Sequence, residues 1–188
     1  MNSNIANIDE AGRGPLAGPV VAAAVILPES HTIEGITDSK KIKPQKRQLL
    51  YKQIKEQAKV GIGIVSNKTI DKINILQATF LAMKLAVRNL PLKPNMLLID
   101  GDKTIPECNI NQKAIIKGDS KVEGIGAASI IAKVTRDKIM EKMDLLFPLY
   151  SFAKHKGYGT KLHKEAIIKY GPSVIHRKTF CKFYYSND

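Results

Sequence analysis

The fold class is decided by an uninterrupted apolar run, Val20-Val21-Ala22-Ala23-Ala24-Val25-Ile26-Leu27, which Pro28 ends. Apolar and polar residues alternate in a half-buried strand, whereas a short, continuous apolar run is typical of a strand with both faces covered. The sequence therefore predicts a strand over residues 20–27 that is buried on both faces.

Strands and helices alternate along the remaining sequence. We expect further strands at 5–9, 60–65, 96–99 and 114–116, and helices starting near Pro44 and covering 71–90, 123–147 and 161–170. Two of these helices carry apolar residues every three or four positions, which predicts one buried face each. These residues are Ile73, Leu76, Phe80, Met83, Val87 and Leu90 in the first, and Ile125, Ala128, Ala132, Ile139, Met143 and Leu146 in the second. Hairpin-like early strands and helix-linked later ones predict an α/β domain with a mixed sheet.

The length and composition are typical of one globular domain. The chain has 188 residues, 44% of them hydrophobic, and no apolar stretch approaches the roughly 18 residues of a membrane span. No basic segment followed by an apolar one opens the chain, so we expect no export signal and a cytoplasmic location. Cys108 and Cys181 lie far apart and outside any zinc-ligand spacing, which predicts two free thiols.

The charge of the chain indicates a polyanionic partner. Lys and Arg number 30 against 17 Asp and Glu, which gives a formal net charge of +13. A strongly basic domain favours nucleic acid as the partner. A general bias of the composition toward Lys is the alternative explanation.

Acidic residues recur where strands are expected to end, although the chain as a whole is short of acid. Asp9 and Glu10 close the first strand before a glycine-rich turn, Asp100 closes the strand over 96–99, and Asp119 follows the apolar pair at 115–116. Hard divalent cations prefer oxygen ligands, and two cations about 4 Å apart can activate a water molecule and stabilise the leaving oxygen of a phosphodiester. Carboxylates in a basic chain therefore predict phosphodiester cleavage.

Six motifs resemble those of bacterial ribonuclease HII, in the same order and over nearly the whole chain. They are Ile8 to Pro19 (IDEAGRGPLAGP), Asp38 to Lys41 (DSKK), Leu98 to Gly101 (LIDG), Lys117 to Ser120 (KGDS), Ala127 to Asp137 (AASIIAKVTRD) and His155 to Thr160 (HKGYGT). The resemblance implies a ribonuclease H-like fold, with a mixed five-stranded sheet flanked by helices and a helical C-terminal part. It also implies one catalytic domain over residues 1–188, in which a C-terminal extension after about residue 148 completes the substrate site.

The activity that this resemblance implies is that of a metal-dependent endoribonuclease. Such an enzyme hydrolyses the RNA strand of RNA/DNA hybrids and cuts at single ribonucleotides embedded in duplex DNA, leaving a 5′-phosphate and a 3′-hydroxyl, in ribonucleotide excision repair and primer removal. The implied cofactor is a divalent cation, Mg²⁺ or Mn²⁺. The implied catalytic and metal-binding residues are Asp9, Glu10, Asp100 and Asp119. Asp137 is the alternative to Asp119, although Asp137 is spaced for an i, i+4 ion pair with Lys133.

The resemblance also assigns substrate-binding residues. The turn Gly12-Arg13-Gly14 would contact the ribose 2′-hydroxyl, which distinguishes RNA from DNA, and glycine lets the backbone come that close. Tyr158 would pack on the sugar beside the scissile junction and help to select single ribonucleotides; a tyrosine that fills the core is the alternative. Candidates for holding phosphates are Ser39, Lys40, Ser129 and Lys133. The spacing of Ser129, Lys133 and Arg136 puts them on one side of the long helix, for which a solvated basic face is the alternative.

The C-terminal segment departs from the family pattern. The family closes with a basic-basic-Ser-Phe segment, whereas this chain continues from His176-Arg177-Lys178-Thr179-Phe180 into Cys181-Lys182-Phe183-Tyr184-Tyr185. Its aromatic spacing is that of a short peptide that docks into a sliding clamp, but the glutamine that opens such a peptide is missing. We therefore expect the tail to pack on its own domain, in a monomer that binds RNA/DNA hybrid and no membrane.

Three alternative functions remain open from the residues alone. Ribonuclease HIII shares the chemistry but carries an N-terminal substrate-binding domain, for which we expect no room before Asp9. Endonuclease V cuts duplexes that contain a deaminated base. A non-catalytic nucleic-acid-binding module would bind with a steep salt dependence and without strand scission, although clustered carboxylates oppose phosphate binding unless cations intervene.

Overall fold

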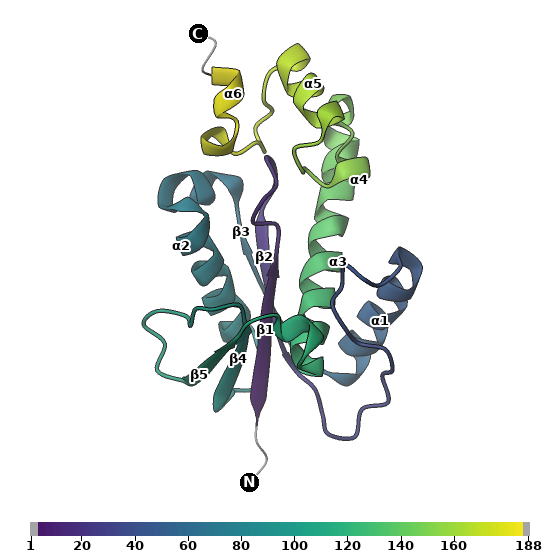
Figure 1. Ribbon diagram of the computed structural model, residues 1–188, viewed down its shortest axis with the longest axis vertical. Helices are drawn as coiled ribbons and strands as arrows, with labels where there is room; N and C mark the ends of the chain where they lie inside the picture. The colour runs from purple at the N-terminus through teal and green to yellow at the C-terminus, as the bar shows by residue number, and fades with distance from the viewer. Residues whose placement is uncertain (1–3, 186–188) are drawn as a thin grey trace.

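The computed structural model describes residues 4–185 and shows a five-stranded mixed sheet with helices on both faces (Figure 1). The strand order is β3-β2-β1-β4-β5. β1 pairs with β2 and β2 with β3 in antiparallel fashion, whereas β1 with β4 and β4 with β5 are parallel. The predicted α/β class with a mixed sheet is confirmed. The strands are β1 (Ile5–Ala11), β2 (Val20–Ile26), β3 (Lys59–Val65), β4 (Met96–Asp100) and β5 (Asn111–Ile115).

The helices form a layer on each face of the sheet and a separate group at its end. α2 (Asn67–Arg88) covers one face, and α1 (Pro44–Gln57) and α3 (Glu123–Leu146) cover the other. α3 extends beyond the sheet, where the short C-terminal helices pack at the top of Figure 1. These are α4 (Phe152–His155), α5 (Lys161–Tyr170) and α6 (Lys182–Tyr185), with the short 3-10 turns η2 (Pro148–Tyr150) and η3 (Lys178–Phe180). A further 3-10 turn, η1 (Gly118–Ser120), lies between β5 and α3.

β2 is buried along its whole length, as its continuous apolar run predicted. Ala22 and Ala24 belong to the core cluster on the α2 side, and Ala23 and Val25 to the cluster on the α1 and α3 side. Small side chains let both helix layers come close to the sheet. The approach is closest at Gly63 on β3, where an added Cβ would overlap the carbonyl oxygen of Ala82 on α2.

The two predicted helix faces are correct only in part. Ile73 is exposed, because α2 is kinked at Asn74 (φ 63°), whose side chain accepts from the N–H groups of Leu76 and Gln77 and caps the helix that continues from there. Leu146 is also exposed, because it lies in the last turn of α3, beyond the sheet. The buried faces are therefore shorter than the periodicity predicted.

The cysteines and the helices bear on two further predictions, those on disulfides and on membrane spans. Cys108 and Cys181 are free thiols, as their spacing predicted, and Cys181 is buried. Among the helices of residues 4–185, none has the length and apolar character needed to cross a membrane.

Candidate active site

The ends of three neighbouring strands bring acidic residues together. β1 and β4 are parallel, with Ile8 beside Ile99, so Asp9 and Asp100 come next to each other one residue further on. Asp119 lies in η1, shortly after β5, which is the parallel neighbour of β4. The strand order therefore explains how acids from distant parts of the chain reach one edge of the sheet.

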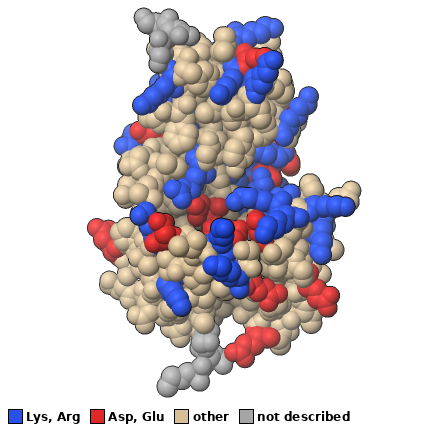
Figure 2. All heavy atoms as spheres, viewed as in Figure 1, with Lys and Arg blue, Asp and Glu red and all other residues tan. Residues whose placement is uncertain are grey.

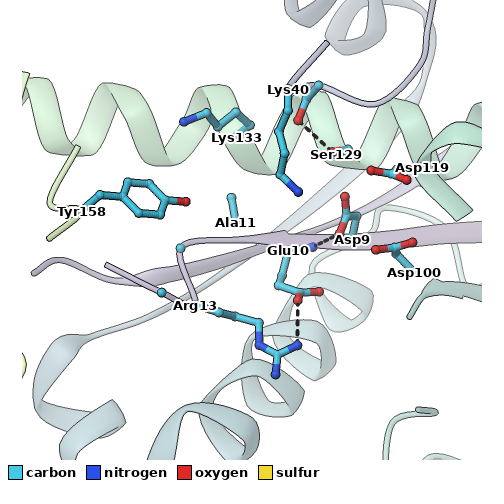
Figure 3. Close-up of a pocket in the computed structure, with 13 residues that line it drawn as sticks. Asp9, Glu10, Ala11, Arg13, Lys40, Asp100, Asp119, Ser129, Lys133 and Tyr158 are labelled. Atoms are coloured by element: carbon cyan, nitrogen blue, oxygen red, sulfur yellow. Dashed lines mark hydrogen bonds and ion pairs between the residues drawn. The ribbon is translucent and has the colours of Figure 1, made fainter. Parts of the chain in front are cut away.

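Asp9 and Glu10 point to opposite sides of β1, Asp9 toward α3 and Glu10 toward α2 (Figure 3). Both still line one pocket, because β1 ends at Ala11 and the chain turns away at Gly12, whose φ is +97°. The Glu10 N–H donates to Asp9 Oδ1 (2.6 Å), and Arg13 Nη1 lies 3.4 Å from Glu10 Oε1. The end of the strand thus allows two adjacent side chains to serve the same site.

The predicted catalytic, metal-binding and substrate-binding residues all line a single pocket of about 430 Å³, whereas Arg136 does not. Figure 2 shows the acidic side chains as a red patch near the middle of this face, with Lys and Arg side chains around it. The wall also includes Ser39, another predicted phosphate contact, and Ala11, which was not predicted. The other predicted residues in the wall are Asp9, Glu10, Gly12, Arg13, Gly14, Lys40, Asp100, Asp119, Ser129, Lys133 and Tyr158.

The loop before α1 and the middle of α3 close the pocket opposite the strands. The hydroxyls of Ser39 and Ser129 lie 2.9 Å apart in a buried hydrogen bond, which ties the loop to α3. The N–H of Lys40 donates to Asp38 Oδ1 (2.9 Å). In Figure 3 the Lys40 amine is directed toward the acidic side chains. The pocket therefore combines carboxylates with flexible cationic side chains.

Burial and mutual repulsion raise the pKa of three of the carboxyls. Asp9 is only 6% exposed, and desolvation, followed by the charges of Glu10 and Asp100, raises its pKa well above the ordinary value. Burial is also the main cause that raises the pKa of Glu10, and burial followed by the charge of Asp100 raises the pKa of Asp119. Several ionised carboxylates in one place are unfavourable unless positive charge is near them, and such perturbed groups are concentrated at functional sites.

The oxygen ligands of the pocket fit a hard divalent cation bound in an open mode. Within residues 4–185, no three His, Cys, Asp or Glu side chains stand close enough together to hold one ion between them. Mg²⁺ is ordinarily bound by one or two carboxylates, while water and substrate phosphate complete its shell. Carboxylates spread around an open space suit that mode, and positive charge there would relieve the repulsion that raises the pKa of Asp9.

Two residues of α3 whose roles the sequence left open, Asp137 and Arg136, have defined contacts in the structure. Asp137 forms an ion pair with Lys133 (Oδ1 to Nζ, 2.8 Å), as its spacing predicted, and stays outside the pocket. Arg136 is 1% exposed and donates to the backbone carbonyls of Ala17, Pro19 and Lys156. Arg136 is therefore not part of an open basic helix face, because spacing along a helix does not say which side faces the protein.

Tyr158 lies on the loop between α4 and α5, 43% exposed, with its ring directed toward the pocket (Figure 3). Buried histidines hold this loop. His155 Nδ1 accepts the Gly157 N–H (3.2 Å), and His163 Nδ1 donates to the Tyr158 carbonyl (2.9 Å). Sequence reasoning offered these histidines no role beyond a phosphate contact, because scattered histidines carry no spacing signal. Only the fold stacks the His155 and His163 rings 4.3 Å apart.

The C-terminal aromatic residues pack on their own domain, as expected. Phe180 packs against the core cluster on the α2 side, and Phe183 and Tyr184 pack against a C-terminal cluster that contains Tyr150 and Phe152. The segment before them holds Arg177, a buried residue whose contacts reach back to the glycine turn. Sequence reasoning did not identify it, and its only signal was a position in the basic segment that closes the family pattern.

Comparisons with known proteins agree over the length of the chain. The family model described as Ribonuclease HII matches residues 6–187. Ribonuclease HII of Acetivibrio thermocellus is 60% identical over 179 residues, covering 95% of this chain and 70% of the relative, and ribonuclease HII of Caldicellulosiruptor saccharolyticus is 55% identical, covering 95% and 87%. The structure of ribonuclease H2 from Pyrococcus horikoshii has a TM-score of 0.76 at 28% identity, covering 97% of each chain. The structure of a PCNA:RNase HII complex from Archaeoglobus fulgidus contains a chain with a TM-score of 0.79 at 26% identity, covering 93% of each.

Proposed function

This chain belongs to the ribonuclease HII family, and we propose that its carboxylate pocket is the catalytic site for cleaving the RNA strand of RNA/DNA hybrids. The observation that carries the assignment is the convergence of four carboxylates, a glycine turn and a half-exposed tyrosine on one pocket. The products are a 5′-phosphate and a 3′-hydroxyl, and the role in the cell is the removal of ribonucleotides and primers. The catalytic and metal-binding residues are Asp9, Glu10, Asp100 and Asp119.

The cofactor in this proposal is a divalent cation, Mg²⁺ or Mn²⁺. When bound, such cations activate a water molecule and stabilise the leaving oxygen of the phosphodiester. The chain itself holds Asp9 and Asp100 side by side on neighbouring strands, and the Gly118 N–H fixes Asp100 by donating to its Oδ1 (2.7 Å). The raised pKa of Asp9 and Glu10 supports this role, because buried carboxylates that repel one another gain from a nearby cation.

Substrate positioning is the second part of the proposal. Lys40 and Lys133 hold phosphates of the nucleic acid in this proposal, and both line the pocket together with the buried Ser129. The turn over residues 12–14 reads the ribose 2′-hydroxyl, and the Tyr158 ring packs on the adjoining sugar, which favours single ribonucleotides embedded in DNA. Tyr158 comes from the segment after residue 148, so this C-terminal extension completes the substrate site of one catalytic domain.

Two statements about the setting of the enzyme belong to the same proposal. The enzyme acts as a monomer in this proposal, since the predicted site residues of a single chain already meet in one pocket. It works in the cytoplasm, where its nucleic-acid substrate is found. Clamp binding is not part of the proposal, although PCNA accompanies the Archaeoglobus fulgidus relative, because Phe180 and Phe183 are packed on their own domain.

The proposal is tested by cleavage of a duplex with one embedded ribonucleotide, with either Mg²⁺ or Mn²⁺ added and the cut phosphate mapped. We expect cation-dependent cleavage at the ribonucleotide, which Asp9→Asn, Glu10→Gln and Asp100→Asn nearly abolish while substrate binding persists. Asp102→Asn is a matched control for Asp100→Asn, because Asp102 is exposed and lies two residues away. It should leave the cleavage rate unchanged.

Two other outcomes would point to the alternative functions. Cleavage of a deaminated-base duplex in preference to the ribonucleotide duplex would indicate a DNA-cutting nuclease. Binding with a steep salt dependence but no scission with either cation would indicate a non-catalytic module. Retained turnover in all three carboxylate variants would overturn the site assignment.

A further inference from the structure

Arg177 is a buried cation that contacts the backbone of the glycine turn over residues 12–14. Its residue surface is 0% exposed, and its guanidinium makes four hydrogen bonds to backbone carbonyls. The acceptors are Gly12 O (2.6 Å), Arg13 O (2.8 Å), Gly18 O (3.0 Å) and Pro19 O (3.2 Å). In the described part of the chain no carboxylate forms an ion pair with Arg177, so these carbonyls are what compensates its loss of hydration. Burial lowers its pKa to about 9, and it stays protonated at neutral pH.

The hydrogen bonds of Arg177 determine which way the peptide groups of the turn face. The carbonyl and the N–H of a trans peptide point in opposite directions. Since the carbonyls of Gly12 and Arg13 point at Arg177, the N–H groups of Arg13 and Gly14 point away from it, on the side where these residues line the pocket. Neither N–H has a hydrogen-bond partner among residues 4–185. Two adjacent unpaired N–H groups form a site suited to an oxygen atom.

Packing prevents the turn and the guanidinium from moving apart. An added Cβ at Gly12 would overlap the side chain of Arg136, so a second buried guanidinium supports the turn. The Phe180 ring lies 5.1 Å from the Arg177 guanidinium carbon, and the Arg177 N–H donates to Leu16 O (2.8 Å). The backbone and the side chain of Arg177 thereby both join the C-terminal segment to the loop after β1.

We propose that Arg177 is a positioning residue for ribose recognition, which aims the N–H groups of Arg13 and Gly14 at the 2′-hydroxyl of the substrate. The inference rests on the proposed function, since it concerns how that site separates RNA from DNA. A lysine at this position keeps the charge but lacks the planar fork that reaches several carbonyls at once. Arg177→Lys should therefore release the turn without changing the net charge.

The test measures the dissociation constants of two duplexes, one with a single ribonucleotide and one of DNA alone, without divalent cations so that no strand is cut. The ratio of the two constants is the ribose preference. In Arg177→Lys we expect this ratio to fall by roughly tenfold, or about 1.4 kcal/mol, the size of one or two lost hydrogen bonds. Binding of the all-DNA duplex should change little, a selectivity that general damage to the fold does not produce. Lys178→Ala is the control, because Lys178 is the neighbouring basic residue and is exposed.

A measurement on the unmodified chain covers the case in which Arg177→Lys does not fold. In amide NMR spectra, the Arg13 and Gly14 signals should shift when the ribonucleotide duplex replaces the all-DNA duplex. Unchanged signals, or an unchanged ribose preference in a folded Arg177→Lys, would overturn the inference while wild-type cleavage still supported the proposed function. A wild-type chain that neither cuts nor prefers the ribonucleotide duplex would contradict the proposed function itself.

Discussion

Replacing Asp9 by Asn should abolish cleavage and at the same time stabilise the fold. Asp9 is buried beside Glu10 and Asp100, and desolvation together with these charges raises its pKa. Asn has the same shape and keeps the Oδ1 atom that accepts the Glu10 N–H. The substitution therefore removes a buried charge and its repulsion but leaves the packing of β1 in place.

The size of the stabilisation follows from the burial of Asp9 and from the charges that surround it. Two unit charges about 6 Å apart repel by roughly 3 kcal/mol at an effective dielectric constant near 20. Solvent in the open pocket screens part of this, so we expect the free energy of unfolding to rise by about 1–2 kcal/mol, the usual gain from relieving a strained functional site. For a chain of this length that is an increase in Tm of about 2–8 °C.

The stabilisation should depend on pH in a defined direction. The folded-state pKa of Asp9 lies above its unfolded value, so its ionisation destabilises the folded chain at neutral pH. This penalty disappears as the pH falls through the raised pKa and the carboxyl is protonated. The difference in Tm between Asp9→Asn and the wild type should therefore be largest near neutral pH and shrink in acid.

Thermal unfolding in a chelating buffer, at pH 7.5 and in acid, measures both effects. Added Mg²⁺ should raise the Tm of the wild type more than that of the variant, because a ligand stabilises only a state that binds it. Asp137→Asn is the control, since it breaks the ion pair with Lys133 and should lower stability by less than about 1 kcal/mol. An Asp9→Asn chain less stable than the wild type in the chelating buffer would refute the charge argument, and one that still turns over would refute the site.

Three further predictions concern selectivity, packing and acid sensitivity. Tyr158→Ala should lower cleavage at a single embedded ribonucleotide by roughly tenfold, the size of one lost stacking contact, and should affect long hybrids much less; equal losses in the two steady-state rates would remove its selective role. Gly63→Ala should lower the free energy of unfolding in urea by about 3 kcal/mol or more, because the new Cβ meets the backbone of α2. Gly101→Ala, which has open space around it and a φ of +105°, should lose only about 1 kcal/mol, and similar losses at both positions would contradict the packing argument. Burial lowers the pKa of His163 and His176 to about 4, below the unfolded value. The free energy of unfolding should therefore be full above about pH 6.5 and fall by about 2 kcal/mol per histidine between pH 7 and pH 5. A His163→Gln variant that loses as much stability in acid as the wild type would count against this.

Predictions that depended on local patterns agreed with the structure over most of the chain. The apolar run over 20–27 became β2, and the apolar stretch before Asp100 became β4. The periodicity of the long helices located α2 and α3 but not their buried limits, since Ile73 precedes a kink and Leu146 lies beyond the sheet. Helical spacing reports which residues share a side, whereas burial depends on what another element places against that side.

Candidate site residues were predictable when each carried its own signal. Acidic residues at strand ends and a glycine turn in a family motif identify the pocket wall, and the parallel register of β1 and β4 explains their convergence. The burial of Arg136 and Arg177 carried no such signal, because an arginine in a basic sequence is ordinarily exposed. Both are buried because backbone carbonyls of the loop over 12–19 and of Lys156 satisfy their guanidinium groups.

The amino-acid sequence by itself determined the order of strands and helices, the family and the carboxylates at the strand ends, because periodicity, turn residues and motifs are properties of neighbouring positions. Only the tertiary structure decided that Asp137 stays with Lys133, that histidines hold the Tyr158 loop and that Arg177 orients the glycine turn. These contacts join segments that are distant in the chain. Their energies depend on which groups are left without water once the fold has formed, and the local sequence does not contain that information.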